Sequence, residues 1–142
     1  MWSVLRGLYG RWRDTPASRV GLLMSVQQIV DLYYDAWINK QGDMSGVPLA
    51  ANFEFLGRVA SFSSAEAYRA MARDAGAMVT AFRVRQQFVD GDRVCSIIDW
   101  EMALPVAPMT SAEILQVEDG ELVRGELIYD AQELRAALAA AG

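Results

Sequence analysis

The stretch FRVRQQFVDGDRVCSIIDWEMAL, residues 82–104, decides the fold class of this chain because it predicts a long β-hairpin. It places Asp90-Gly91-Asp92 between two runs rich in Val, Ile and Phe. An Asp-Gly corner between such runs is a strong short-range hairpin signal. Residues 110–130, TSAEILQVEDGELVRGELIYD, repeat the pattern around a second acidic-glycine corner. The chain is therefore expected to contain two long antiparallel strand pairs.

Three helices are predicted outside these hairpins. Apolar residues at spacings of three and four indicate one over residues 25–41, a second after residue 63 and an alanine-rich third after residue 130. Each is expected to begin at a capping pair three residues apart: Ser25 and Gln28, Ser63 and Glu66, Asp130 and Glu133. Between the first two helices we expect a short helical piece from Asp43 and two short strands, 53–56 and 59–62.

Helices followed by long antiparallel strands indicate an α+β fold. A sheet of long strands twists strongly, and a twisted sheet that curls around helices forms a cone. The open mouth of a cone is a natural ligand pocket. We therefore expect a cone-shaped, strongly curved antiparallel sheet wrapped around about three N-terminal helices, an α+β barrel of the cystatin-like kind.

Length and composition bound the class of protein. With 142 residues, of which 53% are hydrophobic and 22% charged, the chain fits one globular domain that buries roughly two-thirds of its unfolded surface. Its net charge of −5 argues against nucleic acid as a partner, because such binding requires neutralised phosphates. No apolar run reaches the ~18 residues of a membrane span. The single cysteine, Cys95, excludes an internal disulfide and fits a reducing cytoplasm.

Histidine is absent from the sequence, and Lys40 is its only lysine. Ser-His-Asp and Cys-His nucleophiles are therefore excluded, as are histidine-ligated zinc and iron sites. Lys40 stands beside Gly42 at a helix end, where a lysine complements the helix dipole. We expect no metal and no cofactor. Any acid–base catalyst must then be a carboxylate, a tyrosine or water.

Residues 1–23 differ in character from the rest of the chain. They carry four arginines against one aspartate, and the aromatic and leucine residues between Trp2 and Trp12 fall at helical spacing. A basic amphipathic stretch can bind a membrane surface or a partner. The simpler interpretation is an extension that folding does not require, because Met24-Ser25 has the character of a start. We divide the chain into this N-terminal extension, 1–23, and one domain, 24–142.

Several short segments together carry a recognisable pattern. They are Tyr33-Tyr34-Asp35-Ala36-Trp37 with Gly42-Asp43, then residues 88–94, and finally residues 117–120 with 128–130. The pattern spans most of the chain, from about residue 25 to 134, and resembles the nuclear-transport-factor-two-like superfamily, within it the SnoaL-like, ketosteroid-isomerase-like group. The resemblance implies the cone fold and a homodimer. It does not choose an activity, because the superfamily contains several enzymes and many binding domains.

Limonene-epoxide hydrolase, one enzyme of that superfamily, activates water with an Asp-Arg-Asp network, a Tyr and an Asn. In the register that the resemblance implies, Asp99 keeps the first of these acids. Ile97 stands in place of the Arg and Leu127 in place of the second Asp. Glu54 and Leu56 replace the Tyr and the Asn. This mechanism does not carry over intact.

Ketosteroid isomerase offers a second comparison, since it uses an Asp base, a Tyr and a protonated Asp donor. Here the resemblance puts Leu56 at the position of the base and Glu113 at the position of the donor. Tyr34 falls near the position of the Tyr. This signature is also incomplete.

Acidic residues within the predicted sheet mark a candidate site. Asp99 and Glu101 lie two apart and would share one face of a strand with Ile97, while Glu113 lies on the neighbouring strand. Two carboxylates near an apolar pocket can supply a proton donor beside an acceptor. We predict Asp99 and Glu113 as a catalytic pair with coupled titration. The predicted substrate-binding residues are Tyr33, Tyr34, Trp37, Leu56, Ile97, Glu101, Leu127 and Tyr129.

Other interpretations of the same residues stay open. Glu101 can be a solvated residue at the rim, and Glu113 can pair with Arg83 or Arg85 across the sheet. Tyr129 and Trp37 can belong to the core.

The leading functional hypothesis is a small cytoplasmic enzyme that acts on an apolar molecule such as a terpenoid, polyketide or steroid-like compound. It would isomerise, cyclise or dehydrate its substrate, or open an epoxide, by proton transfer. The alternative is a non-catalytic small-molecule-binding module. If Asp99 faces the pocket, an apolar stripe from Ile98 to Leu104 faces outward, and we expect the homodimer to form there.

Overall fold

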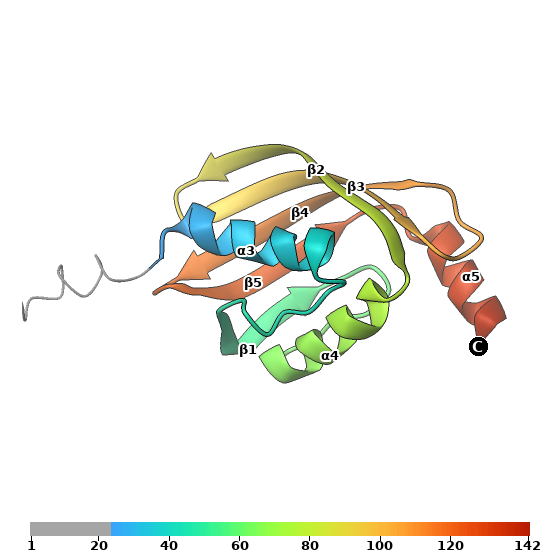
Figure 1. Ribbon diagram of the computed structural model, residues 1–142, viewed down its shortest axis with the longest axis horizontal. Coiled ribbons are helices and arrows are strands. Elements are labelled where there is room, and N and C mark those ends of the chain that lie inside the picture. The colour runs from blue at the N-terminus through green and yellow to red at the C-terminus, as the bar shows by residue number, and fades with distance from the viewer. Residues whose placement is uncertain (1–23) are drawn as a thin grey trace, which may run out of the picture.

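The computed structural model describes residues 24–142 (Figure 1). The N-terminal extension and its predicted amphipathic helix lie outside the described residues. Along the chain the elements are α3 (Val26–Asn39), β1 (Leu49–Leu56), α4 (Ala65–Gly76), β2 (Val79–Asp90), β3 (Arg93–Met102), β4 (Met109–Glu118), β5 (Glu121–Ile128) and α5 (Gln132–Ala141).

The described strands form one curved, unclosed sheet in the order β1-β5-β4-β3-β2. Figure 1 shows α3 crossing the concave side of the sheet, α4 beside β1, and α5 beyond the end of β5. The predicted α+β cone is confirmed. Two details differ: β1 pairs with β5 in parallel, so the sheet is mixed, and only two described helices, α3 and α4, precede the long strands. The third, α5, is the helix predicted after residue 130.

Both predicted hairpins are present. β2 pairs with β3 up to Asp90 and Arg93, and β4 pairs with β5 up to Glu118 and Glu121. Gly91, at the first corner, has a φ of 61°. At the second corner Asp119 and Gly120 have φ angles of 50° and 78°. Only glycine, and less readily Asn or Asp, adopts such angles without strain, which explains why the acidic-glycine corners were informative.

The helix starts agree with the sequence pattern at α3 and differ at the other two. Ser25 and Gln28 form the predicted capping box of α3. The cap of α4 is Ser64, one residue later than predicted, and it accepts a hydrogen bond from the Ala67 N–H. At α5 the cap position is Ala131, which has no side chain able to accept.

The segment between α3 and α4 contains less regular structure than predicted. No helix starts at Asp43, because its carboxylate accepts a hydrogen bond from the Ser45 N–H and forms a turn instead. The predicted strand 59–62 is reduced to an isolated bridge between Phe55 and Phe62. The predicted first strand is longer than expected and begins at Leu49.

The C-terminal ends of α3 and α4 approach each other through glycine. A Cβ atom on Gly42 would lie 2.0 Å from the Ala72 carbonyl oxygen, and one on Gly76 would lie 2.0 Å from the Gln41 carbonyl oxygen. Gly42 also has a φ of 79°. This close approach joins the C-terminal ends of the two helices. Within residues 24–142, no helix has both the length and the apolar character that a bilayer span requires.

Candidate functional site

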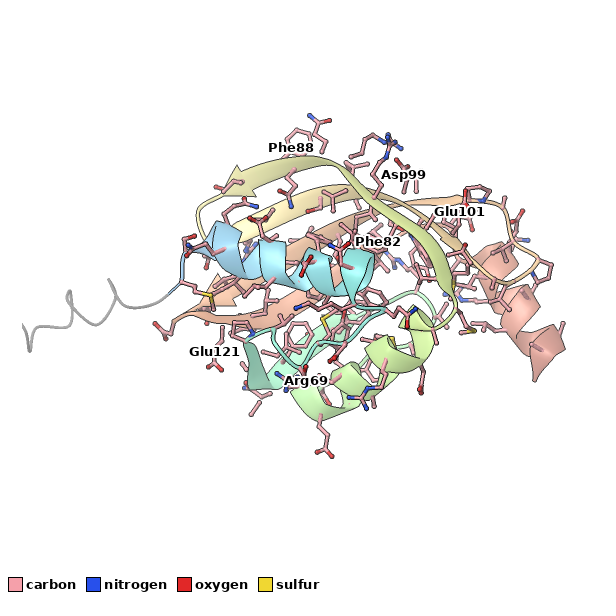
Figure 2. All side chains as sticks on the ribbon, viewed as in Figure 1. Arg69, Phe82, Phe88, Asp99, Glu101 and Glu121 are labelled. Atoms are coloured by element: carbon pink, nitrogen blue, oxygen red, sulfur yellow. The ribbon has the colours of Figure 1, made fainter. Side chains whose placement is uncertain are left out.

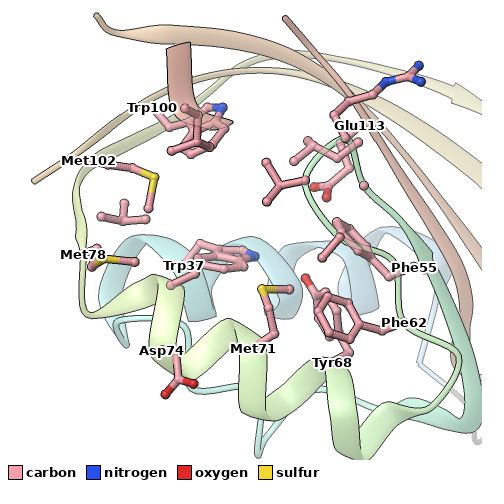
Figure 3. Close-up of a pocket in the computed structure, with 18 of the residues that line it drawn as sticks. Trp37, Phe55, Phe62, Tyr68, Met71, Asp74, Met78, Trp100, Met102 and Glu113 are labelled. Carbon is pink, nitrogen blue, oxygen red and sulfur yellow. The ribbon is translucent and has the colours of Figure 1, made fainter. Parts of the chain in front are cut away.

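A pocket of about 630 Å³ lies between the concave face of the sheet and the helices. Its size is in the range of small-molecule sites. Every described element contributes to its wall, and most of the lining side chains are aromatic or aliphatic. Figure 3 shows Trp37, Trp100, Met78 and Met102 toward one side and Phe55, Phe62, Tyr68 and Glu113 toward the other.

Glu113, from the middle of β4, is the buried acid of this pocket, with 3% of its surface exposed. The Tyr33 hydroxyl donates a hydrogen bond of 2.9 Å to its Oε2, and the Tyr34 hydroxyl donates one of 3.0 Å to its Oε1. Both tyrosines come from the buried face of α3. Adjacent residues of one helix thus hold the two oxygens of one carboxylate.

A second layer of polar side chains supports these phenols. The Tyr68 and Tyr33 hydroxyl oxygens are 2.5 Å apart, and since Tyr33 donates its proton to Glu113, Tyr68 donates to Tyr33. On the other side, Ser96 is paired with Glu113 across the ladder, and Gln87 donates a hydrogen bond of 3.1 Å to its Oγ. The Tyr68 hydrogen bond therefore continues through Tyr33 toward the carboxylate.

Burial dominates the electrostatics of this cluster. It raises the pKa of Glu113 to about 7, although the hydrogen bonds from Tyr33 and Tyr34 oppose the shift. Burial, reinforced by the nearby Glu113 charge, also raises the pKa values of Tyr33, Tyr34 and Tyr68 well above the ordinary value of a tyrosine. At neutral pH the phenols are hydrogen-bond donors, and Glu113 exchanges between its acid and its carboxylate form.

Asp99 lies outside the pocket, on the convex face of the sheet (Figure 2). The Arg83 and Arg85 guanidinium groups bind its carboxylate at 2.9 and 2.5 Å, and Thr110 donates a third hydrogen bond of 2.8 Å. The arginine hydrogen bonds hold the pKa of Asp99 well below its ordinary value. The predicted facing of this strand was therefore wrong.

The register explains why Asp99 and Glu113 do not meet. Glu113 pairs with Ser96 of β3, and Asp99 is three residues further along that strand. An odd separation puts two side chains on opposite faces of a sheet. The predicted coupled pair is thus separated by the sheet itself.

The reversed facing also relocates the predicted apolar stripe. Ile98, Trp100 and Met102 line the pocket instead of the outer surface. The expected dimer interface cannot form through these side chains, because they face the interior of the cone.

The remaining predicted site residues divide into two groups. Four of them line the pocket: Tyr33, Trp37, Leu127 and Tyr129. Tyr34 does not line it but donates a hydrogen bond to Glu113. The other three, Leu56, Ile97 and Glu101, do not line it.

Several pocket residues were not predicted. Tyr68 lies in the helix predicted after residue 63, but its place in the hydrogen-bond chain to Glu113 was not predicted. Phe82 stacks on Trp37 with ring centroids 5.9 Å apart, and Trp100 packs edge-on against Tyr129. The period-two alternation of β2 and β3 puts Phe82 and Trp100 on one face of their strands, but it does not say whether that face is the concave or the convex one. No cluster of His, Cys, Asp and Glu suited to a metal ion occurs among residues 24–142.

Comparison with known proteins gives the fold. No protein-family model and no curated protein matches the sequence. Among solved structures, an NTF2-like protein of unknown function from Cytophaga hutchinsonii is similar, with a TM-score of 0.68 and 20% identity over 78% of this chain and 95% of that one. A steroid delta-isomerase from Pseudomonas aeruginosa has a TM-score of 0.67 and 16% identity, over 84% of this chain and 90% of that one.

A third similar structure is a putative SnoaL-like polyketide cyclase from Shewanella putrefaciens. Its TM-score is 0.62 with 13% identity, over 84% of this chain and 89% of that one. The resemblance stated from the sequence is therefore confirmed in three dimensions. The chain has the nuclear-transport-factor-two-like cone fold that SnoaL-like and ketosteroid-isomerase-like proteins share.

Proposed function

We propose that this protein is a cofactor-free enzyme that isomerises an apolar small molecule by proton transfer, with Glu113 as its acid–base residue. The observation that carries the proposal is one buried carboxylate in an otherwise apolar pocket. A carboxylate whose pKa lies near the working pH can both accept and return a proton. A carboxylate in a cleft whose pKa is strongly raised by burial is a candidate functional group.

The position of Asp99 narrows the reaction type. Epoxide opening and dehydration need one group to activate water or remove a proton while another protonates the leaving oxygen. With Asp99 bound by arginines on the outer face, Glu113 is the one buried carboxylate among the described residues that line the pocket, and the other lining acid, Asp74, is exposed. Isomerisation needs only one such group: Glu113 removes a proton from one carbon of the substrate and returns it to another, with no net change in atoms.

In this reaction Tyr33 and Tyr34 are positioning residues. Their hydrogen bonds hold the two oxygens of Glu113 and stabilise its carboxylate form before the proton is taken. Tyr68 acts through Tyr33 by the same principle. The apolar walls from Trp37, Trp100 and Leu127 would hold the substrate and exclude water.

A second candidate function is a small-molecule-binding module without turnover. One observation favours it: both Glu113 oxygens already have phenol partners, so the cluster is satisfied without a substrate. The two functions differ in one measurable property, the transfer of solvent protons to carbon.

The test of turnover uses deuterium exchange in D2O. We expect cyclic β,γ-unsaturated ketones to gain deuterium at carbon when incubated with the protein, measured by mass spectrometry and proton NMR. Glu113→Gln should slow this exchange by about 100-fold or more, the usual contribution of a general acid–base residue. Asp99→Asn is the matched control and should keep the wild-type rate. Equal rates in the wild type and Glu113→Gln would contradict the assignment, and bound ketone without exchange would favour the binding module.

We also propose a homodimer, formed through the convex face of the sheet in place of the stripe first expected. Phe88 is 55% exposed on this face (Figure 2), and Cys95, which pairs with it across the ladder, is half-buried beside Ile114. Ile97 and Ala112 continue the same apolar face. Clustered apolar side chains on an open sheet face are typical of an interface.

Light scattering tests the interface. The wild type should have the mass of a dimer, and Ile97→Glu should have the mass of a monomer with its fold retained by circular dichroism. Glu101→Gln, further along the same face, is the control and should stay dimeric. A monomeric wild type would contradict the interface.

The cytoplasmic location stays a prediction from the sequence.

A further inference from the structure

From the hydrogen bonds and charges around Glu113, we infer that the ligand of this pocket is a hydrophobic amine, bound with its ammonium group against Glu113. This inference deepens the proposed function, on which it rests for the choice of pocket, by naming the class of ligand. It has three independent supports: the direction of the hydrogen bonds, the missing counter-charge and the aromatic walls.

The direction of the hydrogen bonds favours a negative carboxylate. Tyr33 and Tyr34 each donate to Glu113, and Tyr33 is in turn supported by a hydrogen bond from Tyr68. Donors stabilise the charged form of a carboxylate and disfavour its neutral form. Each oxygen accepts one phenol proton and keeps a further lone pair for another donor. The two phenols therefore favour the anionic form of Glu113, in opposition to its burial.

The counter-charge to this anion is not supplied by the described part of the chain. None of the ion pairs among residues 24–142 includes Glu113, and its polar partners are phenols. The other charged residues that line the pocket, Arg58 and Asp74, are exposed and opposite in sign. A buried charge without a partner is costly, and a bound cation would remove that cost.

The walls of the pocket suit a cation with an apolar body. Phe55, Phe62 and Tyr68 lie on the same side of the pocket as Glu113 in Figure 3. Aromatic faces attract an ammonium group within about 6 Å. Toward the opposite side, Trp37 and Trp100 with Met78 and Met102 offer an apolar surface to the rest of the ligand. A protonated amine on a bulky hydrocarbon matches both sides.

Because Glu113 must be ionised to bind an ammonium group, the affinity for an amine should depend on pH. The titratable groups facing Glu113 are Tyr33 and Tyr34 from α3 and Tyr68 from α4, and their raised pKa values keep them neutral from pH 6 to 8. The residue paired with Glu113 is the uncharged Ser96 on β3 and the apolar Leu127 on β5. With the pKa of Glu113 at about 7, an amine must displace a proton to bind at pH 6 but rarely at pH 8. Its affinity should rise about tenfold between these values, in proportion to the ionised fraction.

The experiment uses three probes of nearly equal shape: 1-adamantylamine, 1-adamantanol and 1-adamantanecarboxylate. Isothermal titration calorimetry of the full chain at pH 8 should show the amine binding at least about tenfold more tightly than the alcohol, with the carboxylate weakest. At pH 6, titrations in two buffers of different ionisation enthalpy should show release of about one proton per bound amine. Glu113→Gln should bind the amine and the alcohol equally, and Asp99→Asn should keep the preference.

The inference is overturned if the alcohol binds as tightly as the amine at pH 8, if the amine fails to bind at millimolar concentration, or if its affinity does not rise with pH. It is also overturned if Glu113→Gln keeps the preference for the amine. Deuterium exchange separates it from the proposed function. Exchange into neutral ketones without amine preference refutes the inference alone, and amine preference without exchange refutes the proposed function alone.

Discussion

Between pH 5 and pH 8 the wild type is expected to lose roughly 2 to 3 kcal/mol of stability, and Glu113→Gln is expected to abolish this loss. The pKa of Glu113 is about 7 in the folded protein and 4.5 ordinarily. Because the folded value is the higher one, the stabilising contribution is fully present below pH 4.5 and is lost as the pH rises through 7. Urea unfolding at pH 5, 6, 7 and 8 measures the effect in both proteins.

Asp99→Asn is the control for this prediction, because Asp99 has the opposite shift. Its pKa is lowered by Arg85 and Arg83, so its contribution is present above its ordinary pKa of 3.8 and is lost only in more acidic solution. Between pH 5 and 8 the Asp99→Asn variant should follow the wild-type slope. A wild-type stability that does not change over this range would contradict the burial of an ionisable Glu113, as would an unchanged slope in Glu113→Gln.

Gly76→Ala is expected to destabilise the protein by about 3 kcal/mol or more, although alanine is the better helix former by about 1 kcal/mol. Gly76 ends α4, and its missing side chain leaves room for the backbone that follows α3. An added Cβ would lie 2.0 Å from the Gln41 carbonyl oxygen and 2.7 Å from the Gly42 nitrogen. Both are backbone atoms, which cannot rotate away as a side chain can, so the two helices would have to separate.

Gly46→Ala provides the matched control. Nothing lies within 4 Å of a Cβ built on Gly46, which is exposed between α3 and β1. We expect this variant to unfold within about 0.5 kcal/mol of the wild type. Denaturant unfolding of the three proteins at one pH provides the comparison. A Gly76→Ala protein as stable as the wild type would show that the ends of α3 and α4 are free to move apart.

The sequence by itself determined the elements whose signals are local. The acidic-glycine corners predicted both hairpins, because few residues other than glycine and aspartate adopt a positive φ. The capping box at Ser25 and the helical spacing after it predicted α3 for a similar reason, since neighbouring residues make every contact involved. These elements, in their order, were sufficient to predict the α+β cone.

The sheet pairing was only partly predictable. The two hairpins connect strands adjacent in sequence, whereas β1 pairs with β5 in parallel across more than sixty residues of intervening chain. No local pattern specifies such a partner, because the two strands are far apart in the sequence and no turn connects them directly. The mixed character of the sheet was therefore missed.

The facing of β3 was decided only by the tertiary structure. Its alternation puts apolar residues on both faces, so a period of two fits either orientation. A bulge after Val84 in β2 inserts Arg85 and brings both Arg83 and Arg85 to Asp99, which neutralises that acid on the outer face. Glu113 is instead enclosed by tyrosines from two helices far away in sequence. The spacing of acids identifies candidates, but the partners that the fold brings to each acid determine which one is buried and which is paired.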